Sequence, residues 1–143
     1  MIPEKPEAGL VLRYAFLWRH EAQQGRDEGA EDRPVLVIVL MASRGEVVVA
    51  PITTRAPGEK DPAIEVPTAV RAHLGLDTRC WISLATLNQF VWPGPDLRTV
   101  PGRRPTTVTY GFVPQRLLDA AKALALKELG RRIPGLVVRR SGD

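Results

Sequence analysis

Arg33 and Thr53 are the residues whose types and spacing best suit chemistry in this sequence. Each borders a dense apolar run: Arg33 precedes residues 34–42, and Thr53 follows residues 47–52. A guanidinium has planar donors that match phosphate oxygens, and a threonine hydroxyl can donate a further hydrogen bond. The candidate chemistry is therefore the binding of an anionic group by a fixed cation beside a hydroxyl.

The two apolar runs predict a β-hairpin that would bring this pair together. Both runs are rich in β-branched residues, and the turn-like segment 43–46 separates them. In an antiparallel hairpin with so short a turn, the first residue of one strand lies beside the last residue of the next. Side chains alternate along a strand, so only one of Thr53 and Thr54 can face the same side as Arg33. The second run is apolar on both faces, which predicts a central strand covered on both sides.

The remaining segments predict a small β structure with helices. Alternating apolar residues predict a strand over 9–17, and a polar insertion over 18–32 could begin as a short helix up to about Gln24. Pro and Gly bound the apolar stripe of residues 114–130, which predicts a long helix. Residues 99–109 predict a loop with little regular structure. Further short strands are predicted over 63–66, 80–84 and 87–92, and a short helix over 67–75.

These elements amount to five to seven strands and one long C-terminal helix. They predict a mainly β fold with α, in which mostly antiparallel strands form a small curled barrel. The chain has 143 residues, 44% of them hydrophobic, which fits a single domain over residues 1–130. Residues 131–143 are predicted to be a basic C-terminal tail. Residues 101–143 contain nine Lys or Arg and three Asp or Glu, so this part of the chain is positively charged. Such a charge suits contact with phosphate backbones, and it equally suits a C-terminal segment that only keeps the protein soluble.

The sequence gives no indication of a membrane span, a metal site or a cofactor. No stretch approaches the roughly 20 apolar residues that a membrane helix needs, and the N-terminus lacks the pattern of a signal peptide. Cys80 is the single cysteine, which suits the reducing cytoplasm as the predicted location. Only two histidines exist, His20 and His73, and no cluster has the spacing of metal ligands.

The motifs RPVLVIV and VVVAPITT are followed by a strand ending near Asn88-Gln89 and then by a C-terminal helix. Their types and order resemble the MazF/PemK family of toxin endoribonucleases. The resemblance runs from about Gly9 to Leu129 and implies an SH3-like barrel that forms a homodimer. It further implies cleavage of single-stranded RNA without a metal, in a type II toxin–antitoxin system. The implied partner is a cognate antitoxin whose disordered, often acidic segment covers the RNA groove.

The resemblance implies that Arg33 and Thr53 are the catalytic pair. RNA cleavage through its own 2′-hydroxyl needs no protein nucleophile, but it needs that oxygen held in line and negative charge on the phosphorane stabilised. Arg33 is assigned to stabilising that charge, with proton transfer secondary because a guanidinium stays protonated and is a poor general base. Thr53 would donate a hydrogen bond to a phosphate oxygen. The candidate substrate-binding residues are Thr54, Arg55, Thr86, Asn88 and Gln89.

Other interpretations stay open at this level. The same fold serves CcdB-like proteins, which poison DNA gyrase and cut nothing. One alternative is therefore a non-catalytic binding protein, either of the gyrase-poison type or a degenerate toxin. Another is a basic nucleic-acid-binding domain that acts through its tail. The ordinary interpretation of Arg33 is a surface arginine ion-paired with Glu31 or Asp32, and acidic residues do precede it: Asp27, Glu28, Glu31 and Asp32.

Overall fold

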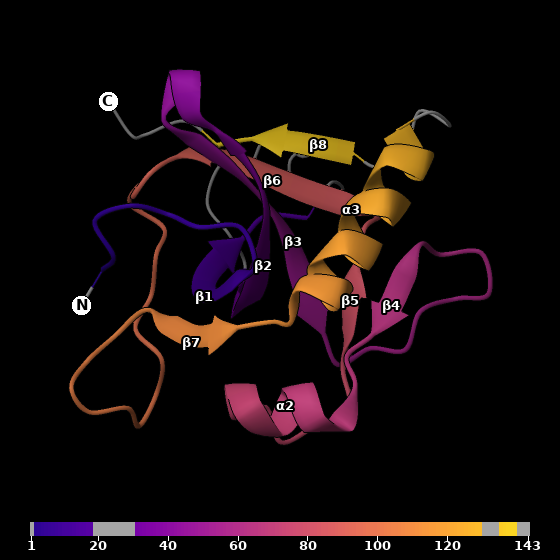
Figure 1. Ribbon diagram of the computed structural model, residues 1–143, viewed down its shortest axis with the longest axis horizontal. Coiled ribbons are helices and arrows are strands. Elements are labelled where there is room, and N and C mark those ends of the chain that lie inside the picture. Colours follow the sequence, from indigo (N-terminus) through magenta and orange to yellow (C-terminus); the bar gives the residue numbers. More distant parts are fainter. Residues whose placement is uncertain (1, 19–30, 130–134, 140–143) are drawn as a thin grey trace.

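A curled sheet with two helices packed on one side forms the body of the protein (Figure 1). The computed structural model describes residues 2–18, 31–129 and 135–139, and within these ranges the sheet has eight strands. The strands are β1 (Leu10–Phe16), β2 (Glu31–Met41), β3 (Glu46–Thr53), β4 (Ala63–Glu65), β5 (Trp81–Ser83), β6 (Thr86–Val91), β7 (Thr109–Phe112) and β8 (Gly135–Val138). The helices are α2 (Thr68–Leu74) and α3 (Gln115–Leu129).

Strand β3 is the centre of the sheet, as its apolar sequence predicts. It pairs with β2 along one edge, in the predicted hairpin, whose turn is a short 3-10 segment followed by Gly45 with φ of 63°. Its other edge is divided, because β6 pairs with the first half of β3 and β5 pairs with its last two residues. The sheet therefore bends along β3 and curls round. Every neighbouring pair in the order β4-β5-β3-β2-β1-β7 is antiparallel. Strand β6 is antiparallel to β3, and β8 is parallel to β6.

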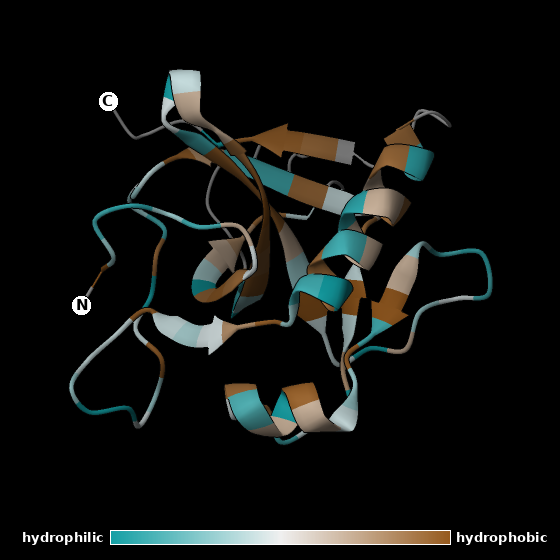
Figure 2. Ribbon diagram, viewed as in Figure 1, coloured by the Kyte–Doolittle hydropathy of each residue, from teal (hydrophilic) through white to brown (hydrophobic). Residues whose placement is uncertain are grey.

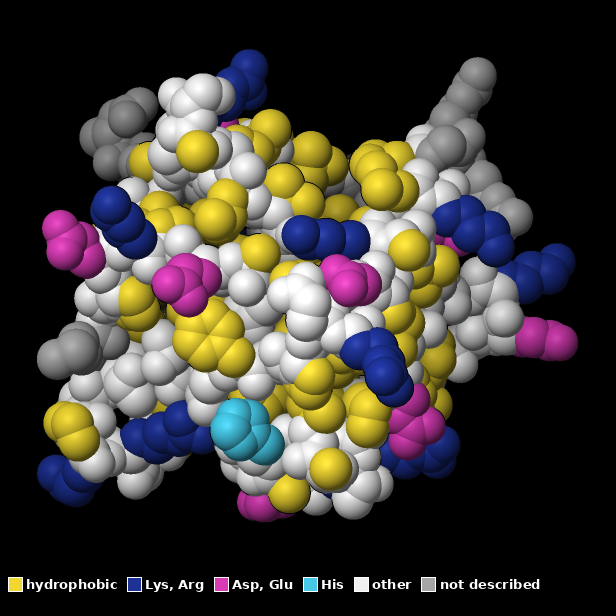
Figure 3. Space-filling view, in the orientation of Figure 1, with side chains coloured by type: hydrophobic (Ala, Val, Ile, Leu, Met, Phe, Trp, Pro, Cys, Tyr) yellow, Lys and Arg dark blue, Asp and Glu magenta, His cyan; other side chains and the backbone are white. Residues whose placement is uncertain are grey.

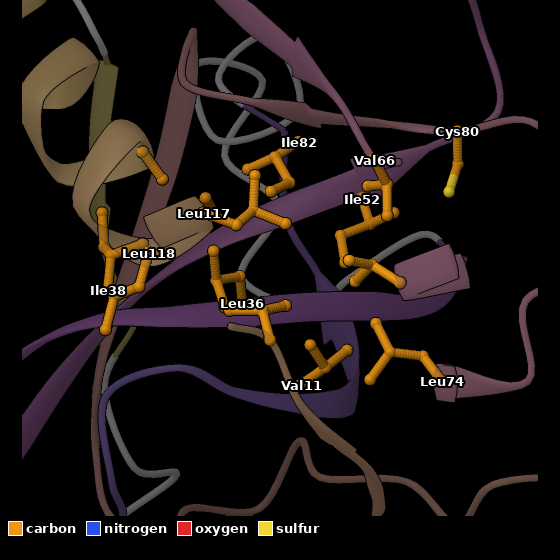
Figure 4. Packing of buried hydrophobic residues seen from close by; sticks show 14 of the residues in the cluster. Val11, Leu36, Ile38, Ile52, Val66, Leu74, Cys80, Ile82, Leu117 and Leu118 are labelled. Carbon is orange, nitrogen blue, oxygen red and sulfur yellow. The ribbon is translucent and has the colours of Figure 1, made fainter. Parts of the chain in front are cut away.

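The main hydrophobic core lies between the sheet and the helices. Helix α3 contributes an apolar stripe with the helical period that its sequence predicts, and α2 contributes Val70 and Leu74. The close-up in Figure 4 shows these helix side chains meeting residues from β1, β2, β3 and β5. Figure 2 shows the same division, with hydrophobic colour along β2 and β3 and hydrophilic colour along the connecting loops. The labelled members are Val11, Leu36, Ile38, Ile52, Val66, Leu74, Cys80, Ile82, Leu117 and Leu118.

A second apolar cluster covers the opposite side of β1, β2 and β3. Its largest members are aromatic, and Tyr14 stacks on Phe90 with ring centroids 4.6 Å apart. Burial on both sides explains why β3 reads as an almost continuous apolar run instead of an alternating one. The cluster consists of Leu10, Leu12, Tyr14, Phe16, Val35, Val37, Val47, Val49, Phe90 and Val108.

The structure differs from the sequence prediction at several elements. Strand β2 begins at Glu31 instead of Pro34, because its first residues pair with the end of β1 up to Phe16. Strand β7 was not predicted; it pairs with β1 after the loop that follows β6. Eight strands therefore replace the predicted five to seven within the described ranges. The short helix suggested near Gln24 lies outside the described residues.

The predicted tail also differs from the structure. Its described part, residues 135–139, extends the sheet, because β8 pairs with β6 and Arg139 donates its backbone amide to the Gln89 carbonyl at 2.6 Å. These five residues therefore belong to the domain. Neither helix in the described part of the chain is long and apolar enough to cross a membrane. Across the same ranges, no three His, Cys, Asp or Glu side chains group where they could hold a metal ion.

Candidate functional site

Arg33 is the third residue of β2, where it stands opposite Tyr14 of β1. Its side chain is only 13% exposed, although it carries a fixed charge. The guanidinium carbon lies 4.9 Å from the centroid of the Trp18 ring, and the guanidinium is ion-paired with Glu31. Stacking on an indole face favours a cation and restricts its orientation. The ion pair with Glu31 is the one that the ordinary interpretation of this arginine predicts.

Thr53 is the last residue of β3 and stands opposite Trp81 of β5. Its side-chain oxygen accepts a hydrogen bond from the backbone amide of Arg55 at 3.1 Å. A hydroxyl can accept and donate at once, so this contact orients the oxygen and leaves its own hydrogen for another acceptor. The side chain is partly exposed, and the following residues Thr54 and Arg55 are exposed.

Strand register places Arg33 and Thr53 on the same side of the sheet. The last pair between β2 and β3 is Val35 opposite Pro51. Arg33 and Thr53 each lie two residues beyond that pair, and residues two apart on a strand project to the same side. Thr54 projects to the other side. The structure thus separates the two threonines, which the sequence alone could not do; the catalytic role of Arg33 and Thr53 stays a prediction.

Thr54 lines a cavity of about 410 Å³ on the opposite side of β2 and β3. Two arginines form part of its wall. Arg13 donates to the Tyr110 hydroxyl at 3.0 Å, and Arg103 donates to three backbone carbonyl oxygens at 2.8–3.0 Å. The first bond joins β1 to β7, and the others attach the loop that carries Arg103 to β7 and α2. Cys80 also lines the cavity, and burial raises the pKa of its thiol.

The structure places the three predicted substrate-binding residues of β6 inside the protein. Thr86 and Gln89 are buried, and Asn88 is fully buried. The Asn88 amide donates to the Leu17 carbonyl at 2.8 Å, and its oxygen accepts from the Leu17 amide at 2.9 Å and from Arg139 at 3.2 Å. Asn88 thereby fixes the end of β1. The structure does not bring these three side chains to an exposed surface beside Arg33.

Arg139 and Asp96 form a buried ion pair that sequence reasoning missed. Arg139 Nη2 donates to Asp96 Oδ2 at 2.9 Å, and their side chains are 3% and 15% exposed. The same guanidinium donates to the Ala15 carbonyl at 2.9 Å and lies 5.5 Å from the centroid of the Tyr14 ring. Burial raises the pKa of the Tyr14 hydroxyl far above its usual value. Arg139 is followed by Arg140, and nothing in the sequence marks the first of these two arginines as buried.

Trp18 and Trp81 are further neighbours of the site that sequence reasoning did not select. The sequence could have indicated Trp81. Side chains alternate along the segment CWIS, so Trp81 projects to the side of the strand opposite the apolar Ile82. Glu31 is the acidic residue beside Arg33 on the same side of β2, whereas Asp32 projects to the other side and its Oδ1 lies 3.6 Å from Arg98 Nε. On the face seen in Figure 3, basic and acidic side chains are likewise interspersed, with no patch of a single sign.

The curled, mostly antiparallel sheet and the long C-terminal helix define a small α+β barrel. No protein-family model matches the sequence, and a search of curated proteins found no match. Among solved structures, the protein is similar to the crystal structure of MazF (Form-I) from Deinococcus radiodurans. The two share 21% sequence identity with a TM-score of 0.51, and the match covers 90% of this chain and 99% of that one. The chain therefore has a MazF-like fold, as predicted.

Proposed function

We propose that this protein is the toxin of a type II toxin–antitoxin system and cleaves single-stranded RNA without a metal ion. The observation that carries the proposal is the placement of Arg33 and Thr53 on one side of adjacent strands, at the ends of the central hairpin of a MazF-like fold. Location in the cytoplasm follows from this proposal.

The proposed reaction uses the substrate's own 2′-hydroxyl as nucleophile. Its oxygen attacks the adjacent phosphorus, the bond to the 5′-oxygen breaks, and the products are a 2′,3′-cyclic phosphate and a 5′-hydroxyl. The proton lost by the 2′-hydroxyl balances the one gained by the 5′-oxygen. Arg33 stabilises the charge that develops on the phosphorane, while Thr53 donates to a nonbridging oxygen and orients the phosphate. The indole of Trp18 supports the guanidinium from one side.

A second candidate is a non-catalytic protein on the same barrel, either a gyrase-poison type or a degenerate toxin. The observation that favours it is the ion pair between Arg33 and Glu31, which already supplies the guanidinium with an anion. Binding through a basic tail has less support, because Arg139 of that segment is buried in the domain.

Cleavage assays in EDTA distinguish these candidates. The parent protein should cut a long RNA and leave cyclic phosphate ends, while Arg33→Ala and Thr53→Ala should each lose about 100-fold or more in rate. Arg33→Lys keeps the charge in a largely buried position and should also lose activity, because an ammonium lacks the planar fork. Arg116→Ala, at an exposed position of α3, is the control. Cleavage that survives both alanine substitutions would overturn the site, and an inactive parent would favour the second candidate.

The proposed partners are an antitoxin with an acidic, disordered segment and a second copy of this chain. Exposed apolar side chains support a homodimer, because large apolar groups on a surface commonly mark protein contacts. Figure 3 shows hydrophobic side chains gathered near β8 and the end of α3. Light scattering should give the mass of a dimer, and Leu126→Lys or Leu136→Lys should reduce it if that surface is the interface. These exposed residues are Leu126 (69%), Leu129 (55%), Leu136 (47%) and Val138 (48%).

A further inference from the structure

Three side chains form a row across β3, β5 and β4 on the surface that carries Thr53. Trp81 stands directly opposite Thr53 on one side and opposite Glu65 on the other. Directly opposed residues project to the same side of a sheet. The neighbouring pair, Ile52 and Ile82, belongs to the main core, so the row faces away from that core. The row therefore continues the surface on which the phosphate is proposed to bind.

Trp81 is held in place by a surface ion pair. Arg79 donates to both carboxylate oxygens of Glu65, at 2.7 and 2.9 Å, and its guanidinium carbon lies 5.1 Å from the centroid of the Trp81 ring. The hydrogen bond from Arg79 lowers the pKa of Glu65, which keeps its carboxylate charged. A two-point contact fixes the guanidinium better than a single one. The pair thus supports the indole from beside the strand.

The environment of Trp81 differs from that of Trp92. Trp92 has a structural place, because its indole nitrogen donates to the Pro3 carbonyl at 3.1 Å and its ring lies against Phe90. The half-buried Trp81 has neither kind of contact: within the described ranges, no residue accepts a hydrogen bond from its indole, and no other aromatic ring stacks on it. An indole in this position has surface and a donor to offer to a ligand.

We propose that Trp81 is the stacking platform for a base of single-stranded RNA whose phosphate is held at Thr53 and Arg33. The inference rests on the proposed function and extends its site by one nucleotide. Neighbouring strands lie about 4.8 Å apart, so the base of a nucleotide bound at Thr53 can reach the ring one strand away. Stacking tolerates any base, because every base has a π-face. Sequence preference must therefore arise elsewhere on the surface.

Binding of an uncleavable probe tests the platform. The probe is a fluorescently labelled single-stranded RNA of mixed sequence with 2′-O-methyl groups throughout, and Kd is measured by anisotropy. Trp81→Leu should weaken binding by about 5- to 100-fold, whereas Trp81→Phe should stay within about threefold of the parent. Trp92→Phe is the matched control and should bind as the parent does. Equal affinity of Trp81→Leu and the parent, or no binding by the parent, would overturn the platform.

Tryptophan fluorescence gives an independent readout that a purely structural role would not change. A stacked base should quench emission from Trp81, so the probe should quench the parent and Trp92→Phe more strongly than Trp81→Phe. Thermal melts of each variant establish that it is folded. Quenching that is as strong in Trp81→Phe as in the parent would contradict the proposal even if affinity falls.

The failure of this inference can be told apart from failure of the proposed function. If the parent cleaves RNA and Trp81→Leu has an unchanged KM, the nuclease stands and the platform is wrong. If the parent binds the probe through Trp81 but cuts nothing, the platform stands on a non-catalytic protein. For an active parent, Trp81→Leu should raise KM by the same factor as Kd and leave kcat within about threefold.

Discussion

Glu31 and Arg33 lie two residues apart on the same side of β2 and form an ion pair beside the Trp18 ring. The side chain of Glu31 is 68% exposed, whereas that of Arg33 is 13% exposed. A phosphate that approaches Arg33 must therefore displace the Glu31 carboxylate or share the guanidinium with it. This relationship links the acidic residues before Arg33 to the strength of substrate binding.

The substitution Glu31→Gln should strengthen RNA binding by up to about fivefold, because exposed ion pairs contribute about 0–1 kcal/mol. The gain should shrink as salt is raised, since screening weakens the competing charge. Binding of the uncleavable RNA at low and high salt measures both effects. Glu59→Gln makes the same charge change at an exposed loop position and serves as the control. Weaker binding by Glu31→Gln would instead make Glu31 part of the binding surface.

Replacing Arg139 should destabilise the fold, because Asp96 would be left as an unpaired, mostly buried charge. Arg139→Ala is expected to lower the free energy of unfolding by about 3–5 kcal/mol. The matched control is Arg98→Ala, whose ion pair with Asp32 is about 40% exposed and should contribute less than about 1 kcal/mol. Urea denaturation measures both. If Arg139→Ala were as stable as the parent, residues 131–143 would behave as the predicted tail, and the pairing of β8 with β6 would not contribute to the stability of the domain.

The substitution Asn88→Leu separates a structural role from a substrate-binding one. It removes the partner of the Leu17 amide and carbonyl, and buried groups without partners are costly. We expect a loss of about 2–4 kcal/mol in the free energy of unfolding. Gln115→Leu, at an exposed position on α3, should change stability by no more than about 0.5 kcal/mol. A stable variant with weaker RNA binding would restore the role predicted from the sequence.

Alkylation of Cys80 should be slow in the folded protein. Burial raises the thiol pKa, so less thiolate exists at a given pH, and the thiolate is the reactive form. At pH 8, iodoacetamide should modify the protein at least about tenfold more slowly than a free cysteine derivative. The rate should rise with pH through the alkaline range and become normal in denaturant. Mass spectrometry follows the reaction, and rapid labelling at pH 8 would contradict the buried position.

Much of the fold could be predicted from local patterns. The hairpin, the strand β1, the helix α3 and the C-terminal glycine of α2 follow from side-chain period and from turn residues. Strands β7 and β8 could not be found in this way. Each has four residues, and each is stabilised by a long-range partner, β1 and β6 respectively. Length alone is not the reason, since β4 and β5 have three residues each and were predicted. Strand β7 contains Gly111 and β8 lies between two basic pairs, so neither shows the apolar alternation that marks a strand.

The sequence by itself determined which residues could do chemistry, and that they close the two strands of one hairpin. It also determined the class of fold, because the apolar runs and turn residues that define strands and helices can be recognised within a few neighbouring residues. Only the tertiary structure decided that Thr53 and not Thr54 shares a side with Arg33, that Asn88 is buried, and that Trp81 lies beside Thr53. Those relationships depend on pairing between strands distant in the chain. Register and burial are set by the packing of the whole barrel, and no single segment encodes them.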